Sequence, residues 1–409
     1  MVNIDVDRRL IVNINWKKVI LSTIEGKPND FLPFVPRMDL WYKANKYNNT
    51  LPKKYRNCSL KEITQDIGIG YHSVVPDFRD FIEGKSQGLL ALGIYDLKTN
   101  PYRIDTDSID IKVSRVGGLT KTVIGTPYGK IHTEYLYDER MKRAGASIGH
   151  TVEHPIKGPK DFRALGYIFK NIGIGQNYSD FLKFQNFVGE DGVAVGFSML
   201  AASPMHHIMK ELMQFENFVY LFNDDLAGME KLAEEINIFY KKNLEIVMDS
   251  TAEVIFLGAN YDSFLTWPPF FKKYISPYLK KWSRAAHRNN KFLLTHADGE
   301  NRGLLDEYVR SGIDVADSIC PEPMTSLALK QIRDVFGHKI TIWGGIPSVC
   351  VLERAMDEYS FEKYMDKTLR EVGDGQNIIL SFADTTPPGA KFERIQKVAG
   401  LARSYKVIK

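Results

Sequence analysis

The stretch Phe292-Leu-Leu-Thr-His296-Ala-Asp298-Gly-Glu300 is a short apolar run that ends in polar side chains and a glycine. A pattern of helical spacing over residues 302–311 follows it, and then another apolar run over residues 313–315. A buried strand, a polar turn and a helix, in this order, form the unit from which parallel sheets are built. The stretch therefore predicts a parallel strand whose carboxyl end carries polar groups.

The same unit recurs on both sides of this stretch. Short apolar runs span residues 193–197, 254–257, 292–294, 313–315, 340–343 and 378–380. Helical patterns alternate with them over residues 225–250, 270–289, 302–311, 324–336 and 361–372. Strands that are apolar on both faces are typical of a barrel, which side chains fill from inside and helices cover from outside. The sequence thus predicts an α/β protein whose residues 1–409 form a single (β/α)8 TIM barrel.

The first third of the chain is less regular. Residues 31–36 are the expected first barrel strand, and a helical extension is expected before it. Residues 86–165 are expected to be a β-rich insertion. Within it, segments 88–96, 109–116, 119–126 and 130–136 alternate in polarity, with turns at Gly117-Gly118 and Pro127-Tyr-Gly129. This pattern predicts antiparallel β-hairpins that form a flap over the barrel.

Composition and charge exclude several classes of function. Of the 409 residues, 44% are hydrophobic and 25% charged, and the net charge of +4 is scattered, which argues against a nucleic-acid partner. Residues 1–22 carry charges between their apolar residues, so neither a signal peptide nor a membrane span is expected. Three cysteines without CxxC spacing favour a reducing, cytoplasmic location. The oligomeric state, including a homodimer, is left open.

The polar residues at the strand ends are the first candidates for chemistry, because active sites of such barrels lie there. His296 and Asp298 are two residues apart, so on an extended strand end they point to the same side, and Asp384 follows a later strand. Imidazole with carboxylates suits zinc, with one position left open for a substrate atom. The alternative is that His296 only caps a strand end by hydrogen bonding while the aspartates N-cap helices.

Two other strand ends supply candidate catalytic residues. Asn260 and Asp262 could orient a substrate oxygen or, if burial raised the pKa of Asp262, donate a proton. Alternatively, Asp262 starts a helix together with Ser263. Glu322 lies between two prolines and is a candidate fourth ligand or general acid, the alternative being a solvated turn carboxylate.

Arg37, Asp39, Trp41 and Tyr42 lie in one short stretch after the expected first strand. Arg37 could grip a ligand carboxylate while Trp41 and Tyr42 offer flat apolar walls. The alternative is an amphipathic helix whose aromatic residues belong to the core and whose Arg37 pairs with Asp39.

His206 and His207 open a helical stretch rich in methionine. Adjacent helix residues diverge by about 100°, so these two histidines cannot easily bind one metal together. The methionines are expected in the core or in a cavity wall.

Motifs spread over most of the chain resemble the uroporphyrinogen decarboxylase superfamily, whose members are (β/α)8 barrels. They lie in residues 16–27, 33–34, 271–278, 293–296, 304–316, 336–340, 343–346 and 379–393. The porphyrin branch carries an arginine-rich segment after the first strand, which holds the propionates. Here that position reads Arg37-Met-Asp-Leu-Trp-Tyr42, so the resemblance disfavours a porphyrin substrate.

The second branch that the chain resembles is the corrinoid-dependent methyltransferases, in which a His-x-Cys pair and a later Cys hold zinc. The matching positions here are His296, Asp298 and Asp384, so carboxylates replace both thiolates. The resemblance then implies a harder ligand set that favours an oxygen-bearing substrate. It is equally compatible with loss of the zinc, or with Glu322 or another acid completing a different set.

Trp41-Tyr42-x-Ala-Asn resembles the methyltransferases that demethylate methoxylated aromatic compounds. The resemblance implies an enzyme that cleaves a methyl ether and passes the methyl group to cobalt(I) of a corrinoid. The ether oxygen must then be protonated or bound to a Lewis acid as its bond breaks. Corrinoid-binding domains display DxHxxG, and none of the nine histidines has an Asp two places before it, so a separate corrinoid protein is expected as partner.

Three alternatives remain beside this hypothesis. The first is a methyltransferase with another methyl donor or with a thiol or pterin acceptor, although the absent cysteines argue against a thiol. The second is a decarboxylase of a smaller substrate that uses Arg37 and Asp262 without metal. The third is a non-catalytic binding subunit, against which the polar residues at several strand ends argue.

Overall fold

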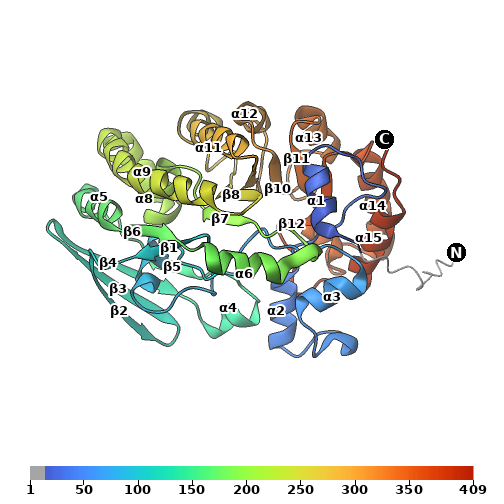
Figure 1. Cartoon of the computed structure of the whole chain (residues 1–409), viewed down its shortest axis with the longest axis horizontal. Helices are drawn as coiled ribbons and strands as arrows, with labels where there is room; N and C mark the ends of the chain where they lie inside the picture. The colour runs from blue at the N-terminus through green and yellow to red at the C-terminus, as the bar shows by residue number, and fades with distance from the viewer. Residues whose placement is uncertain (1–13, 409) are drawn as a thin grey trace.

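A parallel six-stranded sheet forms the centre of the computed structural model, which describes residues 14–408 (Figure 1). Its order is β12-β11-β10-β9-β8-β7, and every neighbouring pair is parallel. The strands are β7 (Gly196–Met199), β8 (Val254–Ala259), β9 (Phe292–His296), β10 (Val315–Ile319), β11 (Thr341–Pro347) and β12 (Ile378–Ala383). Every residue of β7, β8, β10, β11 and β12 is buried, which explains their apolar sequence. The predicted α/β class with a parallel sheet is confirmed.

Two short extended segments link the edges of this sheet. The first segment, residues 33–35, lies beside β12: the backbone N–H of Val35 donates to the carbonyl of Leu380 at 2.9 Å, and the N–H of Leu380 donates to the carbonyl of Pro33 at 2.8 Å. The second segment, residues 70–71, lies beside the first, where the N–H of Gly70 donates to the carbonyl of Phe34 at 3.2 Å. On its other side, the N–H of Tyr71 donates to the carbonyl of Asp191, shortly before β7, at 2.7 Å. The backbone near residues 33–35 and 70–71 therefore connects the last strand of the sheet to the first.

Helices alternate with the strands of the parallel sheet. They are α9 (Leu226–Asp249), α11 (Ser276–Arg288), α12 (Leu305–Ser311), α13 (Leu329–Phe336), α14 (Glu358–Val372) and α15 (Phe392–Ser404). Figure 1 shows α9, α11, α12 and α13 in an arc outside the strands. The side chain of Asp357 caps α14 by accepting from Ser360, and Gly312, at a φ of 73°, ends α12. Helix α13 begins five residues later than predicted, because a hydrogen bond from Glu322 N–H to Leu327 O closes a turn before it.

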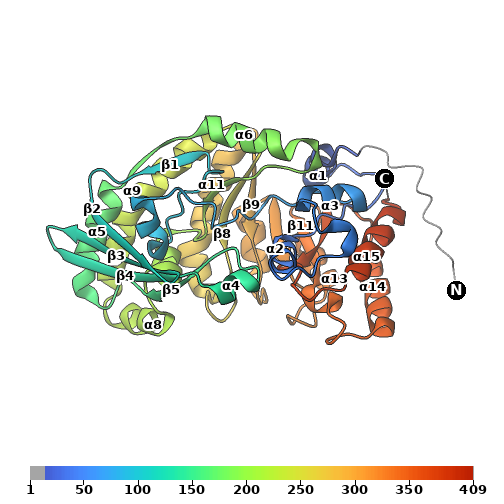
Figure 2. The ribbon, with the colours of Figure 1, turned by 90° about the horizontal axis from the view of Figure 1, so that it is seen from below.

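The β-rich insertion is an antiparallel sheet in the order β2-β3-β4-β5. Its strands are β2 (Asp110–Val116), β3 (Leu119–Thr126), β4 (Gly129–Leu136) and β5 (His150–Glu153), and Figure 2 shows them at the end of the molecule opposite α14 and α15. Gly117 and Gly118 both have positive φ in the two-residue turn that joins β2 to β3, as such a hairpin requires. A separate pair joins β1 (Tyr102–Asp105) to β6 (Gly173–Gln176). The three predicted hairpin strands from residue 109 onward are confirmed.

The strand predicted over residues 88–96 was wrong. A 3-10 helix, η2 (Lys85–Leu92), occupies most of this segment and is buried from Ser86 to Leu92. A Cβ on Gly88 would lie 2.8 Å from Thr122 and 2.9 Å from Val113, so η2 packs directly on the inserted sheet. A segment buried on all sides carries no polar face, and its sequence therefore cannot distinguish a helix from a strand.

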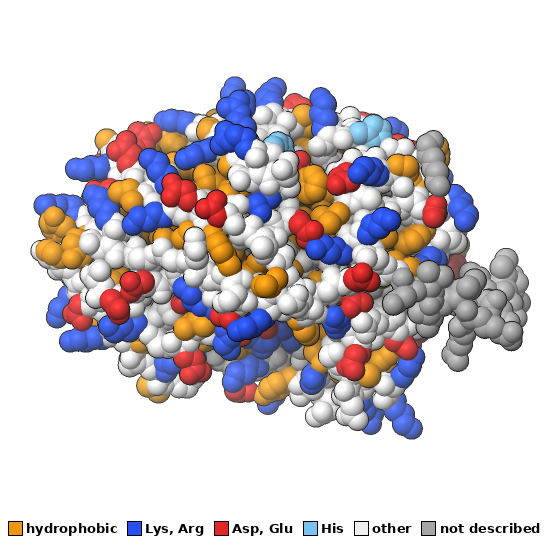
Figure 3. All heavy atoms as spheres, in the orientation of Figure 1, with side chains coloured by type: hydrophobic (Ala, Val, Ile, Leu, Met, Phe, Trp, Pro, Cys, Tyr) orange, Lys and Arg blue, Asp and Glu red, His pale blue; other side chains and the backbone are white. Residues whose placement is uncertain are grey.

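The described chain begins just before helix α1 (Trp16–Ile24), which provides the expected helical extension. The charged residues predicted to exclude a signal peptide lie partly outside the described residues, since only 14–22 of 1–22 are described. Within residues 14–408, no helix is both long and apolar enough to cross a membrane. Basic and acidic side chains are interspersed over the face in Figure 3, as expected from the scattered charge.

Candidate active site

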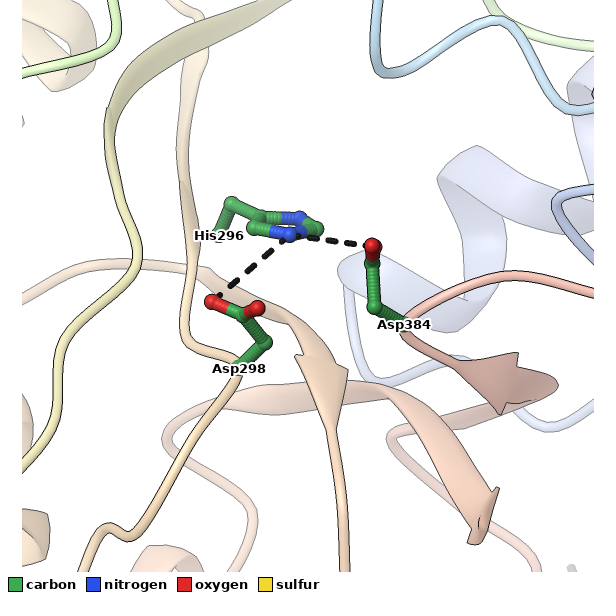
Figure 4. Close-up of side chains that lie close together, drawn as sticks. All are labelled: His296, Asp298 and Asp384. Atoms are coloured by element: carbon green, nitrogen blue, oxygen red, sulfur yellow. Dashed lines mark ion pairs between the residues drawn. The ribbon is translucent and has the colours of Figure 1, made fainter. Parts of the chain in front are cut away.

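The three predicted metal ligands converge at the carboxyl edge of the parallel sheet. His296 ends β9, Asp298 follows it, and Asp384 follows β12. Nε2 of His296 lies 3.8 Å from Oδ1 of Asp298 and 3.2 Å from Oδ1 of Asp384 (Figure 4). One ligand atom from each residue lies within 4.8 Å of the other two. The fold thus brings together side chains that are up to 88 residues apart, 296 against 384, around a common centre.

A fourth residue orients the imidazole. Nδ1 of His296 lies 2.5 Å from Oδ2 of Asp317, which faces it in register on β10. Burial acts to raise the pKa of Asp317, but hydrogen bonds with His296 and His72 lower it below the usual value. An ionised carboxylate only accepts hydrogen bonds, so Nδ1 carries a proton and Nε2 faces the other two carboxylates.

The charges around His296 favour a cation at Nε2. Burial alone would lower the pKa of His296, but the charges of Asp298 and Asp384 raise it to about 10. Burial raises the pKa of Asp298, and the nearby charge of Asp384 adds to this effect. Asp384 is the opposite case, because Arg37 and His296 outweigh its burial and hold its pKa below the usual value. In the chain alone, a proton on His296 supplies the positive charge that these carboxylates attract.

Arg37 is held by the chain's own side chains. Its Nη1 donates to Oδ1 of Asp384 at 2.9 Å, its Nε to Asp39 at 3.0 Å, and its Nη2 to Ser147 at 3.2 Å. The pairing with Asp39, which was the alternative to a ligand grip, is therefore observed. Arg37 therefore positions a candidate metal ligand, and each of its three guanidinium nitrogens already donates to a side chain of the chain itself.

The two aromatic residues predicted as substrate walls lie elsewhere. Trp41, on α2 (Asp39–Tyr47), is buried and stacks on Phe392 with ring centroids 5.4 Å apart. Tyr42 donates its hydroxyl hydrogen to Cys58 O at 3.0 Å and lines a separate pocket of about 400 Å³. The amphipathic-helix alternative accounts for Trp41, because α2 turns this residue toward α15 and the core.

Asn260 and Asp262 have different roles. Asn260 has a φ of 61° at the end of β8, and its Nδ2 donates to both carboxylate oxygens of Asp298 at 3.1 Å. Its Oδ1 accepts from Nζ of Lys210 at 2.7 Å. Asp262 instead accepts from the backbone N–H groups of Phe264 at 2.8 Å and Glu300 at 3.1 Å. Asn260 therefore supports a candidate ligand, whereas Asp262 stabilises the turn that it starts.

Glu322 lies apart from the proposed ligands. Its carboxylate pairs with Lys367, and its backbone carbonyl accepts from Tyr364 at 2.6 Å. Within residues 14–408, the group that could hold a metal ion consists of His296, Asp298 and Asp384 and does not include Glu322. The alternative of a solvated turn carboxylate fits this position better than a ligand role, and the structure adds an ion pair with Lys367.

His296 and Asp384 lie in the wall of a cavity of about 710 Å³. Much of the wall is apolar and comes from Val75, Phe78, Leu200, Met209, Met213 and Phe256. The inserted sheet and the loop before β5 add Tyr135 and residues 146–151. The ring centroid of Phe256 lies 6.3 Å from that of His296. Charged and polar side chains, among them Arg37, Lys210, Glu211 and Asn260, line the rest of the wall. A cavity of this size, with apolar and polar side chains in its wall, suits a small organic ligand.

Several residues of the site were not assigned a role from the sequence. Asp317 was noted only by its position after a strand, and Ser147 and Lys210 not at all. His72 lies on an extended segment too short to form an apolar run, with its Nε2 3.9 Å from Oδ1 of Asp317. The strand-end rule could have found Asp317, but no local signal marks the other three.

Of three comparisons with known proteins, the one with solved structures bears on the fold. No protein-family model matches the chain, and no curated protein matches its sequence. Among solved structures, a methyltransferase from Methanosarcina mazei superposes with a TM-score of 0.50 at 13% sequence identity. The match covers 95% of this chain and 97% of that one. The chain is therefore similar to this structure over nearly its whole length, and at this identity the likeness shows a shared fold.

Proposed function

We propose that this chain is a methyltransferase that cleaves the methyl ether of a methoxylated aromatic compound and passes the methyl group to cobalt(I) of a corrinoid on a separate protein. The observation that carries the proposal is the convergence of His296, Asp298 and Asp384, of which His296 and Asp384 lie in the wall of a cavity of about 710 Å³. The name of the structural neighbour, a methyltransferase, and the sequence motifs support the same class of reaction.

The proposal includes the fold of a (β/α)8 barrel. The hydrogen bonds that Val35 and Tyr71 make to the two sheet edges support it, because these segments would supply the two strands missing from the regular sheet. In such a barrel the active site lies at the carboxyl ends of the strands, where His296 and Asp384 lie.

The residues present fit a zinc ion. Ligand atoms on one tetrahedral zinc are roughly 3.4 Å apart, since each bond is about 2.0 to 2.2 Å long. The 3.2 Å between His296 and Asp384 matches this separation, and the 3.8 Å to Asp298 is close to it. The hydrogen bond of Nδ1 to Asp317 is the partner that a zinc-binding histidine ordinarily has. These three side chains would hold the ion and leave a fourth position for a substrate oxygen.

When bound, zinc would polarise the ether oxygen as a Lewis acid. Phe256, Phe78 and Met209 line the cavity and would exclude water from a bound aromatic ring. Arg37 keeps Asp384 ionised and oriented, and Asn260 orients the carboxylate of Asp298 by donating to both of its oxygens. The methyl carbon–oxygen bond would break with its electron pair left on the oxygen, and cobalt(I) of the partner's corrinoid would supply the new pair to the methyl carbon. The resulting phenolate would take a proton from solvent.

The test combines metal analysis with methyl transfer. We expect about one equivalent of zinc in the purified protein and its loss in the His296→Ala variant. We also expect the loaded protein to methylate a reduced corrinoid protein in the presence of a methoxylated benzoate. A protein that stays metal-free after reconstitution would overturn the zinc assignment. Carbon dioxide release without methyl transfer would favour the decarboxylase instead.

A further inference from the structure

Lys210 lies on a widened helical turn in the wall of the 710 Å³ cavity. The turn is a π-helix, η5 (Ile208–Leu212), and three consecutive residues around it, Met209, Lys210 and Glu211, all line the cavity. Adjacent residues of an α-helix diverge by about 100°, so a regular helix would turn part of such a run away from a common cavity. Turns of the π type are frequent at functional sites.

The ammonium group of Lys210 is held beside the proposed metal centre by Asn260. Nζ donates to Oδ1 of Asn260 at 2.7 Å, and Nδ2 of Asn260 donates to both carboxylate oxygens of Asp298 at 3.1 Å. Lys210 and Asn260 both line the cavity. Asn260 is exposed, and the side chain of Lys210 keeps 20% of its surface exposed, so a molecule in the cavity can reach this pair.

Lys210 keeps hydrogen-bond donors for a ligand. An ammonium group has three N–H donors, and within residues 14–408 the hydrogen bond to Asn260 is the one that Nζ makes. Oε1 of Glu211 lies 4.0 Å from Nζ, which is beyond hydrogen-bond distance. Glu211 instead accepts from the hydroxyl of Tyr95 at 3.4 Å. The charge of Lys210 therefore lacks a directly bonded anion in the described chain.

Arg37 differs from Lys210 in this respect. These two are the lysine and arginine residues among the described residues of the cavity wall. All three guanidinium nitrogens of Arg37 donate to side chains of the chain, so the grip on a ligand carboxylate expected for Arg37 falls to Lys210. An ammonium group with spare donors, in a wall that also carries Phe78 and Phe256, suits a carboxylate on an aromatic ring.

We propose that Lys210 is a substrate-binding residue that recognises a carboxylate on the methoxylated ring. The inference rests on the proposed function for the identity of the ring, and it narrows the substrates to methoxylated aromatic acids. Lys210 then holds one side of the ring while His296, Asp298 and Asp384 receive the methoxy oxygen on another. Two fixed points orient the ring, and a neutral methoxylated ring lacks one of them.

The test compares charged and neutral probes of the same shape. The probes are meta- and para-methoxybenzoate, each paired with the methoxybenzamide of the same substitution pattern. Their binding to the purified protein without corrinoid is measured by calorimetry. Lys210→Met removes the charge and keeps the length of the side chain, and Lys210→Arg keeps the charge. Lys330→Met is the matched control, because it removes one positive charge from an exposed ion pair with Asp334.

We expect Lys210→Met to weaken binding of the preferred methoxybenzoate about 10- to 100-fold, the usual effect of one hydrogen bond to a charged group. Binding of the matching methoxybenzamide should change little. Lys210→Arg should recover most of the loss, and Lys330→Met should bind both probes as the wild type does.

Three results would overturn the inference. Equal weakening of the acid and the amide would show that Lys210 only positions Asn260. An undiminished affinity for the acid in Lys210→Met, or no binding of either acid by the wild type, would show that Lys210 recognises no carboxylate. If Lys210→Met does not fold, the wild type decides, because it must bind the acid more tightly than the amide. Failure of the proposed function is distinguishable, since methyl transfer would then be absent while the preference for the acid persists.

Discussion

Asp317 on β10 and His296 on β9 are cross-strand neighbours, and Oδ2 of Asp317 lies 2.5 Å from Nδ1 of His296. The register of the sheet therefore fixes the orientation of the imidazole. Because Asp317 is 2% exposed in its side chain, water does not compete for this hydrogen bond. The strand pairing that builds the fold thus also aims Nε2 at Asp298 and Asp384.

The first prediction concerns zinc binding by an Asp317→Asn variant. Loss of the charged acceptor should weaken zinc binding about 10- to 100-fold, as observed for second partners of zinc-bound histidines. Competition with a chelator measures the affinity. Asp314→Asn is the matched control, because Asp314 accepts from Leu293 N–H at 2.7 Å and pairs with His287, outside the metal ligands. Equal zinc affinity in both variants would contradict a positioning role for Asp317.

The second prediction concerns the stability of an Arg37→Gln variant. Removing the guanidinium leaves the carboxylates of Asp39 and Asp384 without their main cation. The free energy of unfolding should fall by about 2 to 3 kcal/mol, less than for a fully buried pair, because Asp384 retains contact with solvent. Urea denaturation measures the loss, and Arg37→Lys should recover part of it. An unchanged unfolding midpoint in Arg37→Gln would show that the ion pairs contribute nothing net.

The third prediction concerns pH and Asp77. Its carboxylate accepts from Arg79 and pairs with Lys43 at 2.9 Å. Burial acts to raise the pKa of Asp77, but Arg79 and Lys43 lower it below the ordinary 3.8. A lowered pKa in the folded state stabilises the protein above pH 3.8, and this stabilisation is lost as the pH falls through the folded-state value.

Asp77→Asn should therefore lower the melting temperature at neutral pH, and its difference from the wild type should shrink as the pH falls below 3.8. Circular dichroism at a series of pH values measures both proteins. Asp80→Asn is the control, because its pair with Lys98 is more exposed and should contribute little at any pH. A difference that stays constant with pH would show that Asp77 acts through packing rather than charge.

The fourth prediction concerns the segment at residues 33–35. Nε1–H of Trp343, on β11, donates to Val35 O at 3.0 Å. Trp343→Phe removes this donor from a buried carbonyl and should cost about 1 to 3 kcal/mol beyond the lost ring volume. Trp282→Phe, also fully buried, measures the cost of volume alone. Hydrogen exchange at the Val35 amide should accelerate only in Trp343→Phe. Equal exchange in both variants would show that the hydrogen bond from Trp343 does not hold residues 33–35 in place.

Strands that are apolar along their whole length can be predicted from the sequence. The prediction fails where polar residues of the candidate site occur within a strand. The run at residues 313–315 was predicted, but β10 is Val315–Ile319. Asp317 and Ser318 can be buried because Asp317 bonds to His296 and Ser318 donates to Asp384. Their polar side chains interrupt the apolar pattern, so the sequence does not show that the strand continues. The segments near Val35 and Tyr71 contribute too few residues to give a periodic signal.

The candidate site follows the same division. His296, Asp298 and Asp384 could be predicted because each follows an apolar run, and parallel strands end at the same edge. Trp41 could not be placed correctly, because an aromatic residue on an amphipathic helix looks the same whether it faces a ligand or Phe392. Ser147 contacts the guanidinium of Arg37, 110 residues away in the sequence, and the side chain of His206 bonds to the backbone N–H of Ala202. The spacing of residues in the sequence shows neither contact.

The loop before β5 reaches from the insertion into the cavity wall, where Ser147 contacts Arg37 and Gly149 N–H donates to the Tyr135 hydroxyl at 2.6 Å. The strands of the parallel sheet hold the residues of the proposed metal centre, while this inserted region shapes the space in front of them. Replacement of residues within 148–151, which keeps the contact between Ser147 and Arg37, is therefore expected to change which molecules enter the cavity while the proposed metal ligands stay in place. If the proposed function holds, a change of substrate would need substitutions in the cavity wall, for instance in residues 148–151, and none at the ends of β9 and β12, which carry the proposed ligands.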